Sequence, residues 1–395
     1  MGPLRIGHSA QQYPEQRNII GKVAGADYKL CRDYYSLASS LLSLTHLKGT
    51  SGSVADRPFK FQDFGLNRVD CMHLFNGVSY SRTPWVATFE TFIPRFIEVL
   101  RNHSSHPERL QSSPFIKRAI ESLVSDSCIG LFALSKSAYE LQAGFLELFP
   151  DQRTRILDKT EVLHPPQTVS TRSFGQLSYP FEQGREIRFM LVGHHFFRKG
   201  GQEILRAFQS VRNSTGAALS LCVVSALRSD QYAARADEKD TLQVREFISA
   251  NNDWIDYYPS LPSFEVLEKM AECDVGLLPS YAETYGYSVL ELQSHGRPVI
   301  TTDVRAFPEI NSNHCGWLLN VPKRQLGGEA YFRTPEEREM LSRAIEEGLV
   351  RVLEDIIEKP SQIREKGEKA LKRILDHHDP ENFGKTLETV YRKAL

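Results

Sequence analysis

The stretch that decides the fold runs from Asp274 to Glu309 and reads DVGLLPSYAETYGYSVLELQSHGRPVITTDVRAFPE. Residues 274–280 form a short apolar run that ends in Pro-Ser, which is typical of a buried strand and its exit. A helix is predicted to begin at Gly286 and to end at Gly296, a natural C-terminal cap that a proline follows two residues later. Residues 298–304 then predict a second buried strand. The stretch therefore predicts a strand, a loop, a helix and a strand in succession.

Two carboxylates flank the start of this helix. Glu283 lies in the loop, and Glu291 follows eight residues later, in the second helical turn. The residues that open the helix between them are Tyr285, Gly286, Tyr287 and Ser288. Backbone N–H groups at a helix N-terminus favour an anion such as a phosphate. One carboxylate would then accept from hydroxyl groups on one side of the phosphate, and the other from hydroxyl groups on its far side. A nucleotide sugar has this layout, with the sugar and the ribose on opposite sides of the diphosphate. The alternative is a surface helix with one solvated Glu and one Glu at its N-terminus, which the flanking strands and caps make the weaker interpretation.

Two Glu residues separated by seven others, an aromatic–Gly pair after the first and a following Gly-x-Pro-Val-Ile strand resemble the donor-site motif of retaining glycosyltransferases, the family 4-like enzymes of the GT-B fold. The resemblance implies an α/β protein with two Rossmann-like, doubly wound parallel-sheet domains facing a central cleft. It also implies transfer of a sugar from a nucleoside diphosphate sugar to an acceptor hydroxyl. Glu283 is then expected to hold the hydroxyls of the sugar, and Glu291 the ribose diol.

A second motif of the same family follows the apolar strand predicted over 187–192. Gly193 closes that strand, and the sequence HHFFRKG leads from it into a helix. Lys199 matches the family lysine that binds the donor diphosphate, and the neighbouring Arg198 is expected to supply a second positive charge there. The family commonly has Arg directly after the glycine, where this chain has His194. By resemblance, the turn at Leu261 holds the nucleobase.

The N-terminal half resembles the family less. The family usually has a Gly-Gly loop directly after its first strand, and no such loop follows the strand predicted here over 4–8. A helix is predicted over 27–47 and a polar loop over 101–114. The family histidine that approaches the donor sugar has no counterpart, because the strand over 83–88 is followed by Phe and Glu. Glu90 is therefore the candidate for holding the sugar or the acceptor hydroxyl, with a solvated loop carboxylate as the alternative.

Length, composition and linkers complete the prediction. The chain has 395 residues and a net charge of −1, so two domains are expected and no nucleic-acid partner is indicated. Its six cysteines show no metal-binding spacing, and no apolar run is long enough to span a bilayer. We expect an acceptor-side domain over 1–170, a nucleotide-sugar domain over 171–378 and a helix over 379–395 that returns to the first domain.

The resemblance thus implies a retaining hexosyltransferase that uses a UDP-sugar, needs no metal or other cofactor, and transfers to a glycan or glycolipid in cell-surface polysaccharide or glycolipid synthesis. A cytoplasmic location is expected, with peripheral contact at the inner membrane face compatible with it. Two alternatives stay open, a non-catalytic GT-B subunit that binds nucleotide sugar and a GT-B nucleotide-sugar epimerase. UDP and the cell-surface setting follow from their frequency in the family and from no residue of this chain.

Overall fold

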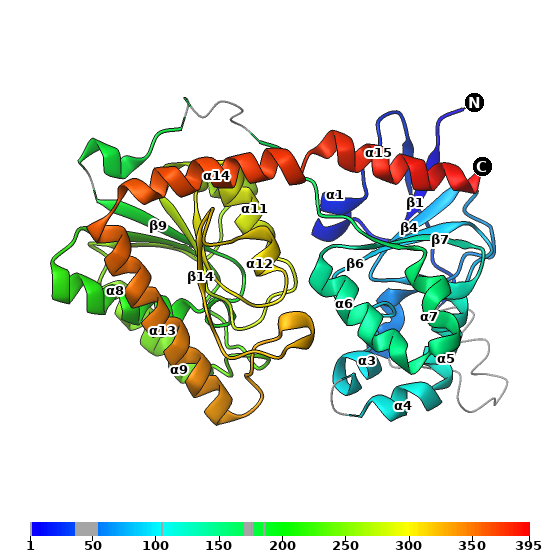
Figure 1. Ribbon diagram of the computed structural model, residues 1–395, viewed down its shortest axis with the longest axis horizontal. Helices are drawn as coiled ribbons and strands as arrows, with labels where there is room; N and C mark the ends of the chain where they lie inside the picture. The colour runs from blue at the N-terminus through cyan, green and yellow to red at the C-terminus, as the bar shows by residue number, and fades with distance from the viewer. Residues whose placement is uncertain (1, 36–53, 104–105, 170–174, 176, 185) are drawn as a thin grey trace. The chain divides into compact units, whose positions relative to one another are not determined.

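The computed structural model describes residues 2–35, 54–103, 106–169, 175, 177–184 and 186–395 (Figure 1). They form two compact units. The first comprises Met1–Pro166 together with Asp379–Leu395, and the second comprises Gln167–His378. The boundary between the units lies four residues before the predicted one at 170/171.

The first unit is built on a six-stranded parallel sheet with the order β2-β1-β4-β6-β7-β8. These strands are β1 (Arg5–His8), β2 (Asp27–Leu30), β4 (Cys71–Phe75), β6 (Trp85–Phe89), β7 (Cys128–Ala133) and β8 (Thr160–Val162). A separate parallel pair joins β3 (Lys60–Phe61) to β5 (Val78–Ser79). The helices are α1 (Tyr13–Asn18), α3 (Ile97–Asn102), α4 (Pro107–Ser112), α5 (Pro114–Val124), α6 (Lys136–Phe145), α7 (Pro150–Leu157) and α15 (Pro380–Tyr391).

The last helix, α15, packs on this sheet although the chain reaches it only after the second unit. A Cβ placed on Gly130 of β7 would lie 2.7 Å from Cγ1 of Val390, so the helix lies close against the strand. His73 of β4 is fully buried, with Nδ1 2.5 Å from the Tyr391 hydroxyl and Nε2 2.8 Å from the Thr88 hydroxyl. His73 is therefore a core histidine whose two nitrogens both have hydrogen-bond partners.

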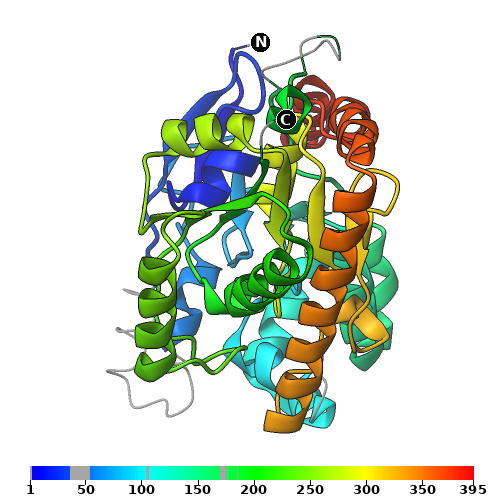
Figure 2. The ribbon, with the colours of Figure 1, turned by 90° about the vertical axis from the view of Figure 1, so that its left-hand side faces the viewer.

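The second unit holds a six-stranded parallel sheet with the order β11-β10-β9-β12-β13-β14. Its strands are β9 (Ile187–Val192), β10 (Leu219–Val224), β11 (Ile255–Tyr258), β12 (Val275–Leu278), β13 (Val299–Thr302) and β14 (Trp317–Leu319). Its helices are α8 (Gly201–Thr215), α9 (Glu238–Ala250), α10 (Ser263–Glu272), α11 (Tyr287–Ser294), α12 (Phe307–Ile310), α13 (Pro335–Glu358) and α14 (Ser361–His377). The long helix α13 packs against α8 (Figure 2).

The two parallel sheets confirm the predicted α/β class, and the strand order of the second unit is that of a doubly wound Rossmann domain. Two sequence predictions in the first unit were wrong. Residues 27–30, expected to begin a helix, form the edge strand β2, because parallel pairing with β1 supplies the backbone hydrogen bonds. The polar stretch 101–114 is largely helical, since prolines open both α4 and α5 at their first turn. Residues 36–47 of the predicted helix lie outside the described residues.

Among the helices of the described residues, none combines the length and the apolar character of a membrane-spanning segment. Within the same ranges, no group of three or more His, Cys, Asp or Glu side chains is arranged to hold a metal ion.

Candidate functional site

The strand order of the second unit reverses between β9 and β12, which are neighbours at the centre of the sheet although α8, β10, α9, β11 and α10 come between them in the chain. β10 and β11 lie on one side of this point, and β13 and β14 on the other. Ligands of open α/β sheets bind outside the carboxyl ends of the strands at such a switch point. The two motifs found in the sequence follow β9 and β12, so the fold brings both to the place where this architecture binds ligands.

Lys199 and Glu283 meet at this point. The Lys199 Nζ atom forms an ion pair with the Glu283 carboxylate, and both side chains are largely covered, with 15% and 14% of their surface exposed. A Cβ placed on Gly193 would lie 3.3 Å from Cε of Lys199, so the lysine side chain runs over the glycine that ends β9. The sequence predicted separate roles for the two charges, and the structure places them in direct contact.

The turn before α8 presses against the exit of β12. Gly200 has a φ of +74°, and a Cβ there would lie 2.4 Å from the Pro279 carbonyl oxygen. The Tyr281 N–H donates to the Arg198 carbonyl oxygen at 2.9 Å. Because only glycine tolerates both the positive φ and this approach, the turn that carries Lys199 is fixed against the loop that carries Glu283.

Arg198 is held by a partner that the sequence did not predict. Its Nη2 atom lies 2.8 Å from Oδ1 of Asp230, whose side chain is 3% exposed, and its guanidinium lies 4.9 Å from the ring centroid of Tyr232. The other oxygen of Asp230 accepts N–H groups from Ala233 at 2.9 Å and Ala234 at 2.8 Å. Burial would raise the pKa of Asp230, but Arg198 and these two amides outweigh it, and the pKa is lowered. Arg198 is thus paired within its own unit, and its role toward a diphosphate stays a prediction.

The helix α11 begins beside the Lys199–Glu283 pair. Its N-cap, Gly286, has a φ of +95°, and a Cβ there would lie 2.6 Å from Cε1 of Phe307. Tyr285 is buried, with its ring centroid 5.5 Å from that of Tyr287. Tyr287 and Ser288 form the first turn, where a helix offers backbone N–H groups to an anion, and the partly buried Glu291 lies one turn further on.

The structure therefore brings together most of the predicted site in one unit. Lys199, Gly193 and Glu283 are in contact, and α11 carries the residues that follow. Leu261 is partly buried and lies past the end of β11, two strands away from β9. Its role toward a nucleobase stays a prediction.

Glu90 belongs to the first unit. It follows β6 at the carboxyl edge of that sheet, where it forms an ion pair with Arg95 and accepts from the Asn76 amide at 3.4 Å. Glu90 is therefore paired and partly buried, unlike a solvated loop carboxylate. Burial raises the pKa of nearby Glu15, and the charge of Glu90 adds to this increase.

Comparison with known proteins follows the same division of the chain. Residues 186–326 match the sequence profile of the family described as Glycosyl transferases group 1. Both motifs lie within this segment. This segment is therefore similar to a glycosyl transferases group 1 domain.

One curated relative matches part of the chain. The lipopolysaccharide glucosyltransferase WaaG of Escherichia coli (strain K12) is 30% identical over 135 residues, which cover 34% of this chain and 33% of that protein. The chain thus spans about a third of the length of the curated relative that it matches.

Solved structures resemble the chain over its whole length. Anabaena HepE, in complex with UDP, has a TM-score of 0.59 at 12% identity and covers 100% of both chains. WaaG, described as a glycosyltransferase involved in lipopolysaccharide biosynthesis, has a TM-score of 0.51 at 17% identity, covering 92% of this chain and 86% of its own. At these identities the resemblance establishes the fold, and the fold is that of GT-B glycosyltransferases.

Within the segment that matches the group 1 family, sequence reasoning missed the charged groups that support the motifs. Asp230 lies in a loop between β10 and α9 with no motif around it. Glu203, 3% exposed, accepts hydrogen bonds from the hydroxyls of Tyr281 at 3.0 Å and Ser342 at 2.6 Å. Each was invisible in the sequence because its partner lies tens of residues away. The one available signal was Glu203, an acidic residue on the otherwise apolar buried face of α8.

Proposed function

We propose that this protein is a retaining glycosyltransferase that moves a sugar from a nucleoside diphosphate sugar to an acceptor hydroxyl. The observation that carries the proposal is the meeting of Lys199 and Glu283 at the switch point of the sheet, beside the N-terminus of α11. A cation, a helix N-terminus and a carboxylate at one place match a diphosphate that is joined to a sugar.

Each group has a distinct task in this proposal. Lys199 and the amides that open α11 stabilise the negative charge that develops on the departing phosphate. A diphosphate beside Lys199 competes with Glu283 for the ammonium group and leaves that carboxylate to accept from the sugar hydroxyls. Glu291, one turn into α11, accepts from the ribose diol, a task for which two carboxylate oxygens are suited.

The reaction breaks the bond between the anomeric carbon and the phosphate oxygen and forms a bond to the acceptor oxygen on the same face of the sugar. The proton of the acceptor hydroxyl passes to the departing phosphate oxygen. This route needs no dedicated base and no metal ion.

We take UDP as the nucleotide and a glycan or glycolipid of the cell surface as the acceptor, with the enzyme in the cytoplasm or at the inner face of the membrane. HepE, whose structure is described with UDP, and WaaG, described in lipopolysaccharide biosynthesis, support these finer assignments by analogy. The charged pair at the switch point supports a nucleotide sugar without specifying its base.

Calorimetric titration with UDP and with GDP tests the donor site. We expect one nucleotide to bind wild type and binding to be lost in Glu291→Ala. Glu246→Ala, which removes an exposed carboxylate from α9 in the same unit, is the matched control and should bind as wild type does. Failure of both nucleotides to bind, or equal binding by Glu291→Ala, would refute the proposed site.

Incubation with the donor alone separates the reaction types. Slow release of free sugar and nucleoside diphosphate is the expected side reaction of a transferase without its acceptor. An epimerised nucleotide sugar would instead indicate an epimerase, and unchanged donor despite tight binding would indicate a non-catalytic subunit.

A further inference from the structure

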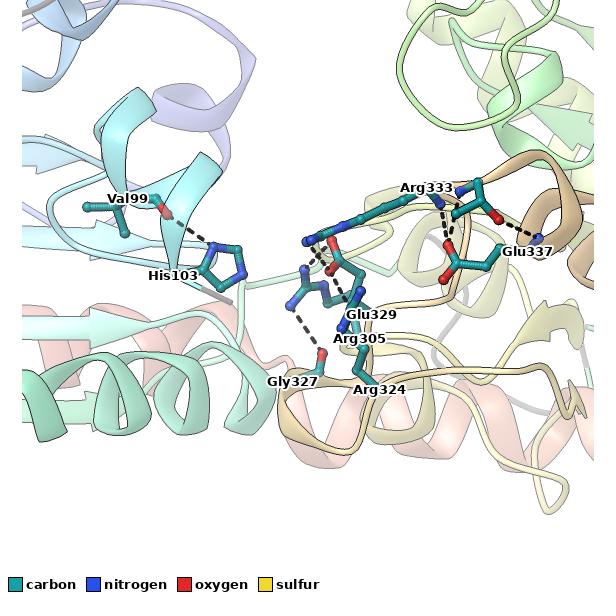
Figure 3. Close-up of polar contacts among 9 residues, drawn as sticks. Val99, His103, Arg305, Arg324, Gly327, Glu329, Arg333 and Glu337 are labelled. Atoms are coloured by element: carbon teal, nitrogen blue, oxygen red, sulfur yellow. Dashed lines mark hydrogen bonds and ion pairs between the residues drawn. The ribbon is translucent and has the colours of Figure 1, made fainter. Parts of the chain in front are cut away.

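Three arginines surround a single carboxylate in the second unit (Figure 3). Glu329, whose side chain is 11% exposed, lies 3.2 Å from Nη2 of Arg305 through one oxygen. Its other oxygen lies 3.5 Å from Nε of Arg324 and 3.4 Å from Nη2 of Arg333. We call Arg305, Arg324, Arg333 and Glu329 the arginine cluster. Guanidinium groups are the side chains best matched to planar oxyanions, so the cluster has the chemistry of an anion receptor.

The backbone is shaped around the innermost arginine. Arg305 follows β13 and has a φ of +51°, which is uncommon for a residue with a side chain. Its N–H donates to the Gly328 carbonyl oxygen at 3.0 Å, and its Nη1 donates to that of Gly327 at 3.2 Å. Both glycines have a positive φ, of +67° and +61°. The turn at Gly327 and Gly328 therefore wraps the arginine and fixes the direction of its guanidinium.

Charge in the cluster is not balanced. Three guanidinium groups share one carboxylate, and the neighbouring Asp303 and Lys323 pair with each other. The carboxylate of Glu337 accepts the N–H groups of Arg333 and Thr334 at the start of α13. Among the contacts of the described residues, the four basic side chains (three arginines and Lys323) therefore face three carboxylates, those of Glu329, Asp303 and Glu337. Positive charge that is partly buried and in excess is costly unless an anion completes it.

Arg305 is the least exposed of the three arginines in the cluster. Its side chain is 12% exposed, and burial is the main cause that lowers its pKa, with Arg324 adding to the effect and Glu329 and Tyr232 opposing it. A further negative charge beside Arg305 would stabilise its buried positive charge. The cluster thus gains more from an added oxyanion than a neutral ion pair would.

The arginine cluster adjoins the proposed donor site within the same unit. The Tyr232 ring lies under the Arg198 guanidinium, contacts Phe332 with centroids 5.5 Å apart, and is close enough to Arg305 to influence its pKa. Two residues after Arg305, Phe307 packs against Gly286 at the start of α11. The cluster and Lys199 therefore lie at the same carboxyl edge of one sheet, connected through Tyr232.

We propose that the arginine cluster binds a carboxylate or phosphate substituent of a sugar substrate, separately from the donor diphosphate. The inference rests on the proposed function for the identity of the ligand as a sugar. The anionic group has two sources, a uronic acid or similar group on the donor sugar, or an acidic or phosphorylated acceptor sugar.

Titration with free sugars tests the cluster without requiring glycosyl transfer. Glucuronate and glucose 6-phosphate should bind wild type, and glucose should not. Arg324→Gln and Arg333→Gln should each lower the affinity for both anionic sugars by about tenfold or more. These two side chains are 32% and 42% exposed, so their replacement leaves the fold intact more readily than that of Arg305. The matched control is Arg343→Gln, which removes a 68% exposed arginine of α13 and should leave binding unchanged.

The source of the anion follows from a second pair of titrations. A preference for the uronate over the neutral form of a nucleotide sugar, abolished by Arg324→Gln, assigns the cluster to the donor. Binding of glucose 6-phosphate that persists in the presence of the nucleoside diphosphate assigns it to the acceptor. Equal binding of anions by wild type, Arg324→Gln and Arg333→Gln, or no preference for anions over glucose, overturns the proposal. If wild type binds the anionic sugars but neither UDP nor GDP, the proposed function is refuted and the anion site at the arginine cluster is retained.

Discussion

Lys199 is the only ion-pair partner of Glu283 among the described residues, and replacing it by alanine removes that partner. Lys199 is 15% exposed, so its ammonium acts through a medium of reduced polarity. At an effective dielectric constant of about 20 and a separation of about 4 Å, one such charge contributes about 4 kcal/mol to a phosphate. Loss of one oxyanion donor elsewhere costs about 3 kcal/mol. We therefore expect kcat to fall by a factor of about 100 or more.

The assay is donor turnover, measured in the steady state with the nucleotide that the titrations identify. Lys366→Ala is the matched control. It removes a partly buried lysine whose Nζ lies 3.1 Å from the Gly316 carbonyl oxygen, just before β14 and hence at the amino edge of the same sheet. Both variants lose a partly buried lysine, but only Lys199→Ala should lose turnover. A kcat for Lys199→Ala within a few-fold of wild type would refute the role given to this residue.

Two further predictions concern stability. Gly286→Ala must place a Cβ 2.6 Å from Phe307 at a φ of +95°, and should lower the free energy of unfolding, measured by urea denaturation, by about 3 kcal/mol. Gly184→Ala, with a φ of +70° and no atom within 4 Å of the new Cβ, is the control and should lower it by only about 1 kcal/mol. Equal losses would show that the Phe307 side chain moves aside without cost. Burial lowers the pKa of His73 to about 3, below the value of about 6.5 expected when unfolded, so its neutral form contributes stability that is complete above pH 6.5 and decreases as the pH falls toward 3. Relative to His73→Phe, wild type should lose about 3 kcal/mol between pH 6.5 and pH 4, and a difference that does not change with pH would contradict this reasoning.

Local patterns were sufficient for the second unit. The apolar strand ended by Gly193 and the stretch from Asp274 to Glu309 each show their elements through runs, caps and prolines that act within a few residues. The strand predicted over 187–192 has those bounds in the structure. In the first unit, residues 27–30 had a helical pattern but pair with β1, because a strand at a sheet edge is decided by its neighbour.

The sequence by itself determined the parallel α/β class, the two motifs and the residue types at the candidate donor site, because helix caps, buried strands and loop glycines depend on adjacent residues. Only the tertiary structure decided which charges meet. Lys199 is 84 residues from Glu283, and Arg198 is 32 residues from Asp230. The arginine cluster likewise joins the loop after β13 to the residues that precede α13. Such contacts arise when distant strands end at one edge of a sheet, which no local pattern of the chain records.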